Sequence, residues 1–130
     1  MTTQGISWLG IETHNWGKSV AFWEALGFKL EFETDHHSGS LVGPNGTRVF
    51  LAEQSPENPV GVDVYLSVAE GGAEPPPNVD VVFDWTATHW GTQVMTVRDP
   101  DGRLLRLEAP APESAPESAS AEGEDPHSAA

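Results

Sequence analysis

The chain has 130 residues, with six basic and 20 acidic side chains, and its formal net charge is −14 at pH 7. This length suits a single domain, and the negative charge argues against a nucleic-acid partner because it repels phosphate backbones. No apolar run approaches the roughly 18 residues of a membrane span. Cysteine is absent, which excludes disulfides and thiolate chemistry and is typical of a cytoplasmic protein.

The carboxyl end differs in composition from the rest of the chain. Residues 111–130 carry acidic side chains and no Lys or Arg, and repeat Ala, Pro, Glu and Ser without any aromatic or β-branched residue. Such a segment has too little apolar surface to offset the entropy of ordering it. We therefore predict a folded domain over residues 1–110 and a disordered acidic tail over residues 111–130.

The first half of the domain begins with a predicted strand over residues 6–12. Asn15 is a plausible N-cap, because its side chain can accept hydrogen bonds from the first free amides of a helix. The helix is expected to end near Leu26, and Gly27 suits the left-handed position just past a helix end. Apolar residues at helical spacing, Val20 with Trp23 and Phe22 with Leu26, predict an amphipathic face.

Three further strands follow in the first half. Residues 28–33 alternate apolar and charged side chains, which predicts a half-buried strand with Phe28, Leu30 and Phe32 facing inward. A short strand is expected near residues 40–42. The Pro-Asn-Gly turn at residues 44–46 then leads into a strand over residues 47–52. The first half is thus predicted as β-α-β-β-β.

The second half repeats this pattern without its helix. A polar linker over residues 54–61 precedes a predicted strand at residues 61–68. The Gly pairs and Pro triplet in residues 69–77 cannot sustain a helix. Strands are expected at residues 79–84, 92–98 and 103–108, the last two joined by the Asp-Pro-Asp-Gly turn at residues 99–102.

Two of these segments carry a resemblance to a known family. The closing hairpin around Asp99-Pro-Asp-Gly102, and the helix from Ser19 to Gly27 that runs directly into a strand at Phe28, resemble the glyoxalase/bleomycin-resistance/extradiol-dioxygenase superfamily, also called the vicinal oxygen chelate fold. The resemblance implies an α+β fold in which two β-α-β-β-β modules, the second with its helix eroded, form a curved mixed sheet around a cavity. It also implies a homodimer.

Metal-using members of this superfamily place ligands on the first, fifth and last strands. Matched residue by residue, those positions are Trp8, Asp63 and Arg106 in this chain. An indole nitrogen only donates hydrogen bonds, and a guanidinium is a permanent cation, so neither can ligate a metal ion. Asp63 can bind a metal, but one carboxylate alone is a poor site. These departures from the family pattern predict a cavity without a metal or other cofactor and without assigned catalytic residues.

Neighbouring side chains on the same strand faces, together with the tryptophans, are the candidates for ligand binding. Arg106 is expected to pair with Asp63 or Glu12, because buried charges need partners; alternatively Glu12 or Glu108 holds a cationic ligand. Glu108, at a strand end, is expected to be a rim residue. His36 and His37 are expected in a solvated turn. The predicted ligand-binding set comprises Trp8, Glu12, Asp63, Tyr65, Trp85, His89, Trp90 and Arg106.

The sequence thus predicts a metal-free small-molecule-binding protein that resembles bleomycin-resistance proteins and sequesters an aromatic or cationic organic ligand. An alternative is a divergent glyoxalase-like lyase, epimerase or dioxygenase that uses Asp63, His89 and Glu12. A third is a regulatory subunit that contacts a partner through its tail. We expect a cytoplasmic homodimer without a nucleic-acid or membrane partner.

Overall fold

The computed structural model describes residues 1–111 and divides into two compact units. The N-terminal unit comprises residues 8–63, and the C-terminal unit comprises residues 1–7 together with the chain from Val64 onward. Of the predicted tail, all but Ala111 lies outside the described residues. Within residues 1–111, no helix has the length and apolar character needed to cross a membrane.

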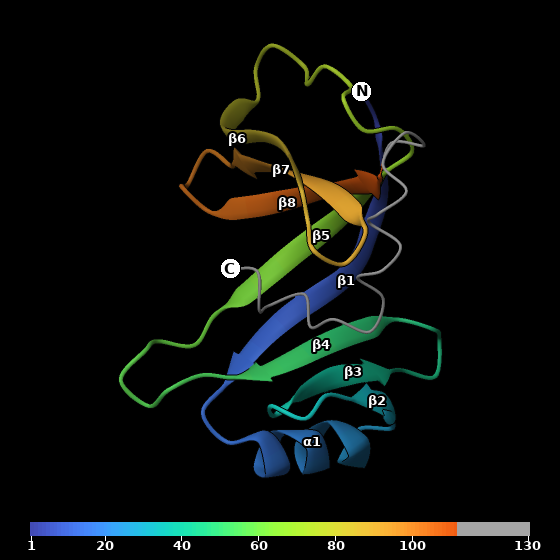
Figure 1. The fold of residues 1–130 in the computed structure, drawn as a ribbon, viewed down its shortest axis with the longest axis vertical. Coiled ribbons are helices and arrows are strands. Elements are labelled where there is room, and N and C mark those ends of the chain that lie inside the picture. Colours follow the sequence, from blue (N-terminus) through green and yellow to red (C-terminus); the bar gives the residue numbers. More distant parts are fainter. Residues whose placement is uncertain (112–130) are drawn as a thin grey trace. The chain divides into compact units, whose positions relative to one another are not determined.

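The N-terminal unit has one helix against one face of a mixed sheet (Figure 1). The strand order is β2-β3-β4-β1, with β1 parallel to β4 and the other pairs antiparallel. The elements are β1 (Thr3–Thr13), α1 (Trp16–Ala25), β2 (Lys29–Glu33), β3 (Ser38–Val42) and β4 (Arg48–Glu53). The predicted β-α-β-β-β order of the first half is confirmed.

The ends of α1 follow the residues that the sequence singled out. The Asn15 side chain accepts a hydrogen bond from the backbone amide of Lys18 at 3.0 Å, as an N-cap does. Gly27, at φ +101°, takes the left-handed conformation just after the helix, where a side chain would be strained. The chain then turns directly into β2.

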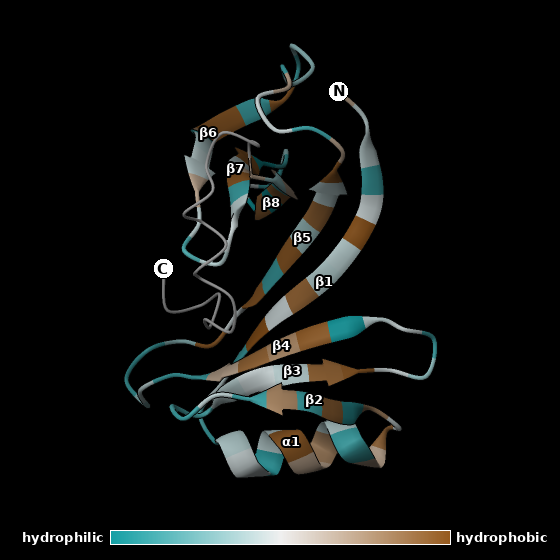
Figure 2. Cartoon of the chain, turned by 45° about the vertical axis from the view of Figure 1, so that its right-hand side comes forward, coloured by the Kyte–Doolittle hydropathy of each residue, from teal (hydrophilic) through white to brown (hydrophobic). Residues whose placement is uncertain are grey.

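The helix packs through the stripe formed by Trp16, Val20 and Trp23 against a core of fully buried β3 and β4 side chains, which are Leu41, Val49 and Leu51. Figure 2 shows the corresponding apolar colouring along most of β4 and in the middle of α1. The predicted pairing of Phe22 with Leu26 on the packed face is wrong: these side chains are 59% and 58% exposed. Phe22 and Leu26 lie on a different side of the helix from the packed stripe, whose spacing follows the 3.6-residue period.

A β-bulge changes the predicted facing of β2. Phe28 and Leu30 pack against the core as expected, whereas Phe32 is 44% exposed and does not. The pairing of β2 with β3 shifts register between Leu30 and Phe32, so Glu31 is an extra residue in the strand. A bulge places two successive residues opposite one partner, and it therefore moves Phe32 to the sheet face away from α1.

As far as residue 111, the C-terminal unit is a sheet without a helix. Its strand order is β1-β5-β8-β7-β6, with β5 parallel to β8 and the pairs β8·β7 and β7·β6 antiparallel. The elements are β5 (Val62–Val68), β6 (Asp80–Ala87), β7 (Thr92–Arg98) and β8 (Leu104–Pro110). As predicted, the segment between β5 and β6 contains no helix, and the α+β architecture of two modules is confirmed.

The missing helix leaves the core of this unit to be covered by other segments. One sheet face presents buried apolar side chains, which are Val68, Met95, Val97, Leu107 and Ala109. Met1, Val79 and Trp85 pack against them. The Trp85 indole N–H donates to the carbonyl of Ala73 at 3.1 Å, which ties the 69–79 loop to this cover. Met1, Trp85 of β6 and Val79 of the 69–79 loop therefore cover this core, as α1 covers the core of the first module.

Candidate ligand-binding faces

The structure distributes the eight predicted site residues between the two units. Trp8, Glu12 and Asp63 belong to the N-terminal unit, and Tyr65, Trp85, His89, Trp90 and Arg106 belong to the C-terminal unit. The predicted pairing of Arg106 with Asp63 or Glu12 would join the two units and stays a prediction. Each unit presents a sheet face opposite its core, and these two faces carry the candidate chemistry.

On the N-terminal unit, the face opposite α1 carries a row of three aromatic rings. Leu9 and Ile11 point into the core under α1, so alternation along β1 places Trp8 on the other face. The Trp8 ring lies 6.4 Å from that of Phe50, edge to face, and Phe50 lies 6.1 Å from Phe32. Phe50 is 4% exposed and Phe32 is 44% exposed. The row is thus rigid at its centre and accessible at Phe32.

An ion pair borders this aromatic row. Arg48, opposite Trp8 in the β1·β4 register, donates from Nε and Nη2 to the two carboxylate oxygens of Glu31 at 2.8 and 2.7 Å. Ser40 donates to the same carboxylate at 3.1 Å. The hydrogen bond from Arg48 lowers the pKa of Glu31 below its usual 4.5. The bulge therefore supplies both the exposed ring and a fixed carboxylate beside it.

Glu12 has a structural role on the same unit. Its Oε1 accepts from the backbone amide of Gly61 and its Oε2 accepts from the side-chain amide of Gln54, both at 3.0 Å. The backbone amide of Glu12 in turn donates to the carbonyl of Gly61 at 3.0 Å. Glu12 therefore anchors the linker between β4 and β5. These bonds favour a structural assignment over the sequence-based alternative that Glu12 holds a cationic ligand.

On the C-terminal unit, the face opposite the core is polar and centres on Arg106. The register places Arg106 between Tyr65 on β5 and Thr96 on β7, and residues directly opposite on neighbouring strands share a face. Arg106 Nη1 donates to the Thr96 hydroxyl at 2.9 Å. Tyr65 is only 8% exposed. The guanidinium therefore lies on the part-buried polar face of this sheet.

Glu108 lies two residues further along the same face and was expected only to border it. Its Oε2 accepts from the indole N–H of Trp90 and from the hydroxyl of Thr92, both at 2.8 Å. The Trp90 ring stands edge to face with His89 at 5.1 Å. Glu108 and Thr92 also line an open pocket of about 780 Å³. The structure thus gives Glu108 a position among the candidate residues that the sequence-based set lacked.

Trp85 belongs to the core cover on the opposite side of this sheet. Besides its contact with the core cluster, it lines a second, smaller hollow of about 450 Å³ together with Met95, Pro75 and Asp84. Packing is therefore its main role, and the polar face carries Arg106, Glu108 and Tyr65 instead.

Trp8 and Arg106, two of the three strand positions matched to metal ligands in the sequence analysis, do not fit a divalent metal ion. Trp8 has no lone pair to offer, and Arg106 is a cation that already donates to Thr96. Within residues 1–111, no group of three or more His, Asp or Glu side chains is arranged to hold a metal. No reaction step is therefore assigned to a metal in this chain.

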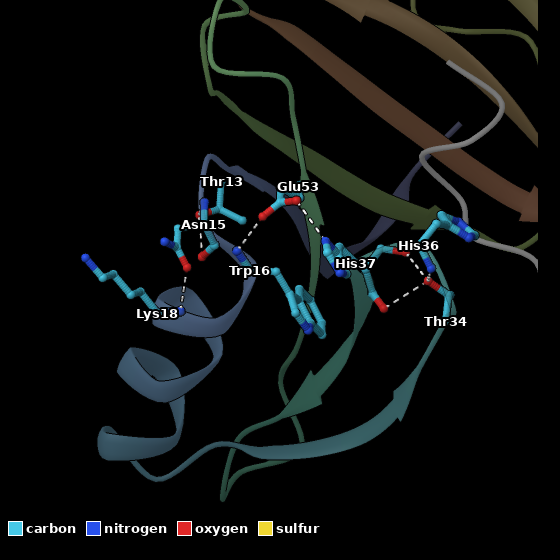
Figure 3. Close-up of polar contacts among 9 residues, drawn as sticks. Thr13, Asn15, Trp16, Lys18, Thr34, His36, His37 and Glu53 are labelled. Carbon is cyan, nitrogen blue, oxygen red and sulfur yellow. Dashed lines mark hydrogen bonds and ion pairs between the residues drawn. The ribbon is translucent and has the colours of Figure 1, made fainter.

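A separate polar cluster joins α1 to the β2–β3 turn (Figure 3). Glu53 accepts from the backbone amide of Trp16 at 2.9 Å and contacts His37 Nδ1 at 2.9 Å. Both contacts lower the pKa of Glu53, and the contact with His37 has the larger effect. His37 has the unusual φ of +59° and its carbonyl accepts from the amide of Glu53. The expected solvated turn is thus tied to the helix start.

Solved structures share this architecture. A glyoxalase/bleomycin resistance protein/dioxygenase superfamily member from Vibrio splendidus 12B01 matches with a TM-score of 0.60 and 18% identity, over 84% of this chain and 99% of that chain. A halotolerant catechol dioxygenase, BphC, matches with a TM-score of 0.58 and 14% identity, over 87% of this chain and 42% of that chain. This chain has the glyoxalase/bleomycin resistance/dioxygenase fold.

At these identities, the likeness shows the fold of the glyoxalase/bleomycin resistance/dioxygenase superfamily and nothing finer. The same architecture also matches a structure described as an NAD-dependent benzaldehyde dehydrogenase from Legionella pneumophila, with a TM-score of 0.54, 17% identity and coverage of 78% of this chain and 96% of that chain. No family model and no curated protein matches this sequence. Function has to be argued from the side chains on the two sheet faces.

Proposed function

We propose that the protein is a metal-free small-molecule-binding protein that sequesters an organic ligand of aromatic or cationic character. The observation that carries the proposal is the aromatic row of Trp8, Phe50 and Phe32 on the sheet face opposite α1. Flat aromatic ligands bind well to rigid aromatic side chains, because they stack at little cost in side-chain entropy. Arg106, where a metal ligand would stand in metal-using relatives, supports binding without metal chemistry.

The charge of the protein supports the cationic part of the proposal. A formal net charge of −14 raises the local concentration of cations at the surface. A carboxylate fixed by hydrogen bonds from neutral donors, such as Glu108, is suited to pair with a positive group. A lyase, epimerase or dioxygenase that uses Asp63, His89 and Glu12 is the weaker alternative, because both carboxylate oxygens of Glu12 already anchor the linker.

A cytoplasmic homodimer remains part of the proposal. Strand β6 is an edge strand of the C-terminal unit, and it exposes Phe83 (63%) and Val81 (37%). Exposed apolar edge strands are surfaces on which a second chain can pair. Light scattering of the purified protein tests the dimer, and a Phe83→Lys variant is expected to shift it toward monomer.

The binding function is tested by titrating the full chain with a neutral planar probe, 1-naphthalenemethanol, and following the five indole N–H resonances of the tryptophans by NMR. We expect saturable shifts of the Trp8 resonance. Phe32→Ser is expected to weaken binding by about 5- to 10-fold, the loss of one aromatic contact.

Phe22→Ser is the matched control, because Phe22 is also exposed but lies on α1 away from the row; its affinity should equal that of the unmodified chain. Equal loss in both variants, or no saturable binding, contradicts the proposal. Metal analysis after incubation with Zn²⁺, Mn²⁺ and Ni²⁺ completes the test. One equivalent of tightly bound metal per chain would refute the metal-free assignment.

A further inference from the structure

The described residues that line the pocket beside Glu108 all belong to the C-terminal unit. Its wall is made where β5 and β8 end and β7 begins, with contributions from the start of the chain and from the last described residue. The volume of about 780 Å³ falls within the range of roughly 300–1,000 Å³ that is typical of small-molecule sites. The pocket is therefore large enough for a compact organic ligand.

The wall combines one charged group with mostly small side chains. Among the described residues of the wall, Glu108 is the only ionisable side chain, and Val68, Ala69, Ala109 and Pro110 supply apolar surface. An organic ligand that suits such a wall has one positive group and an apolar body. A carboxylate facing an otherwise uncharged wall discriminates against anionic ligands, because like charges that are brought together in a partly dehydrated site repel strongly.

Hydrogen bonds hold the Glu108 carboxylate in a fixed orientation. The indole N–H of Trp90 and the hydroxyl of Thr92 both donate to Oε2. Trp90 lies just before β7 and Thr92 begins it, and β7 is the strand that pairs with β8. An ionised carboxylate has about four lone-pair sites, so it can accept hydrogen bonds from several donors at once. Such preorganisation reduces the entropy that binding must otherwise offset.

We propose that this pocket binds an organic ammonium ion, with the carboxylate of Glu108 accepting hydrogen bonds from the ammonium group and the small apolar side chains covering the body of the ligand. The inference rests on the proposed function and deepens it, because it names the ligand class and the residue that recognises it. Trp90 and Thr92 are positioning residues: they act on the ligand through Glu108.

The experiment compares two probes of nearly the same shape, benzylamine, which is a cation at neutral pH, and benzyl alcohol, which is neutral. Each is titrated into the full chain at low salt while the Trp90 indole N–H resonance, assigned with a Trp90→Phe variant, is followed by NMR. This proton is hydrogen-bonded to the Glu108 carboxylate, so its chemical shift reports directly on a ligand bound there. We expect benzylamine to bind at least about 10-fold more tightly than benzyl alcohol, as a charge-assisted hydrogen bond requires.

Glu108→Gln is the decisive variant, because its amide oxygen can still accept from Trp90 and Thr92 while the negative charge is lost. We expect it to weaken benzylamine binding by about 10-fold or more and to leave benzyl alcohol binding unchanged. Glu57→Gln removes the same charge from the exposed linker and should leave both affinities unchanged. Far-UV circular dichroism checks that each variant is folded.

The outcomes separate this inference from the proposed function. If both probes bind equally and Glu108→Gln changes neither affinity, the inference is overturned, while the binding function stands. If 1-naphthalenemethanol binds at the aromatic row but benzylamine leaves the Trp90 resonance unchanged, the inference is again overturned alone. If none of the three probes binds, both fail.

Discussion

The face of α1 that packs against the sheet can be tested with two adjacent aromatic residues. Trp23 packs against the buried cluster of the N-terminal unit and stands edge to face with Phe28 at 5.0 Å. Its neighbour Phe22 is 59% exposed. Replacing either residue by Ala changes the helix propensity by a similar amount. The difference in stability between the two variants therefore mainly measures how well each side chain is packed.

The magnitudes follow from burial. Replacing a fully buried aromatic residue by Ala costs about 3–5 kcal/mol, and because Trp23 is only partly buried we expect a loss of roughly 2–3 kcal/mol in the free energy of unfolding. Phe22 is mostly exposed and stands edge to face with Trp23. Its loss is expected to be less than about 1 kcal/mol, partly offset by the higher helix propensity of Ala.

Urea unfolding followed by far-UV circular dichroism measures both values without relying on the fluorescence of the residue removed. With a denaturant slope of about 1–3 kcal/mol per molar urea, Trp23→Ala should lower the midpoint by roughly 1–2 M and Phe22→Ala by less than about 0.5 M. Equal shifts, or a larger shift for Phe22→Ala, would mean that α1 is rotated about its axis relative to the sheet, and the argument from helical period would be refuted.

Three further outcomes are expected. Asn15→Ala removes the helix N-cap and should lower the free energy of unfolding by about 1 kcal/mol in the same urea assay, with Asn15→Asp close to neutral. The hydrogen bond with His37 lowers the folded-state pKa of Glu53 below its usual 4.5. The stabilising effect of this carboxylate is therefore present above pH 4.5 and is lost as the pH falls through the folded-state pKa. In thermal melts from pH 6 to pH 3, the melting temperature of Glu53→Gln should fall less steeply than that of the unmodified chain, and an equal fall would contradict the assignment. Gly39→Ala would place a methyl group against the backbone carbonyl of Phe32, and it should lower the free energy of unfolding by about 1–3 kcal/mol. If this variant is as stable as the unmodified chain, the close approach of β2 to β3 is wrong.

Much of the fold could be predicted from local signals. Asn15 and Gly27 mark the ends of α1, and the Gly and Pro residues between β5 and β6 exclude a second helix, because each acts within a few residues on the backbone. Phe32 was misplaced because alternation along a strand assumes an unbroken register. The bulge at Glu31 depends on how β2 pairs with β3, and no property of residues 28–33 alone reveals it.

The candidate site was predictable only in part for a similar reason. Trp8 and Arg106 followed from strand alternation and the family resemblance. Its place at a strand end predicts a rim position for Glu108. The hairpin register, however, places Val94 opposite it and therefore brings the start of β7 near its carboxylate. Counting outward from the Asp99–Gly102 turn would have indicated that proximity. The bonds from Trp90 and Thr92 depend on the bend before β7, which local patterns do not specify.

The division of β1 between the two units bears on the order in which the chain folds. Residues 8–63 cluster into one compact unit. Residues 3–7, the other end of β1, belong to the second unit, where the hydroxyl of Ser7 bonds to the carbonyl of Tyr65, 58 positions along the chain. Closing so long a loop is entropically unfavourable until β5 is available. The two ends of one continuous strand are therefore expected to acquire their partners at different stages of folding.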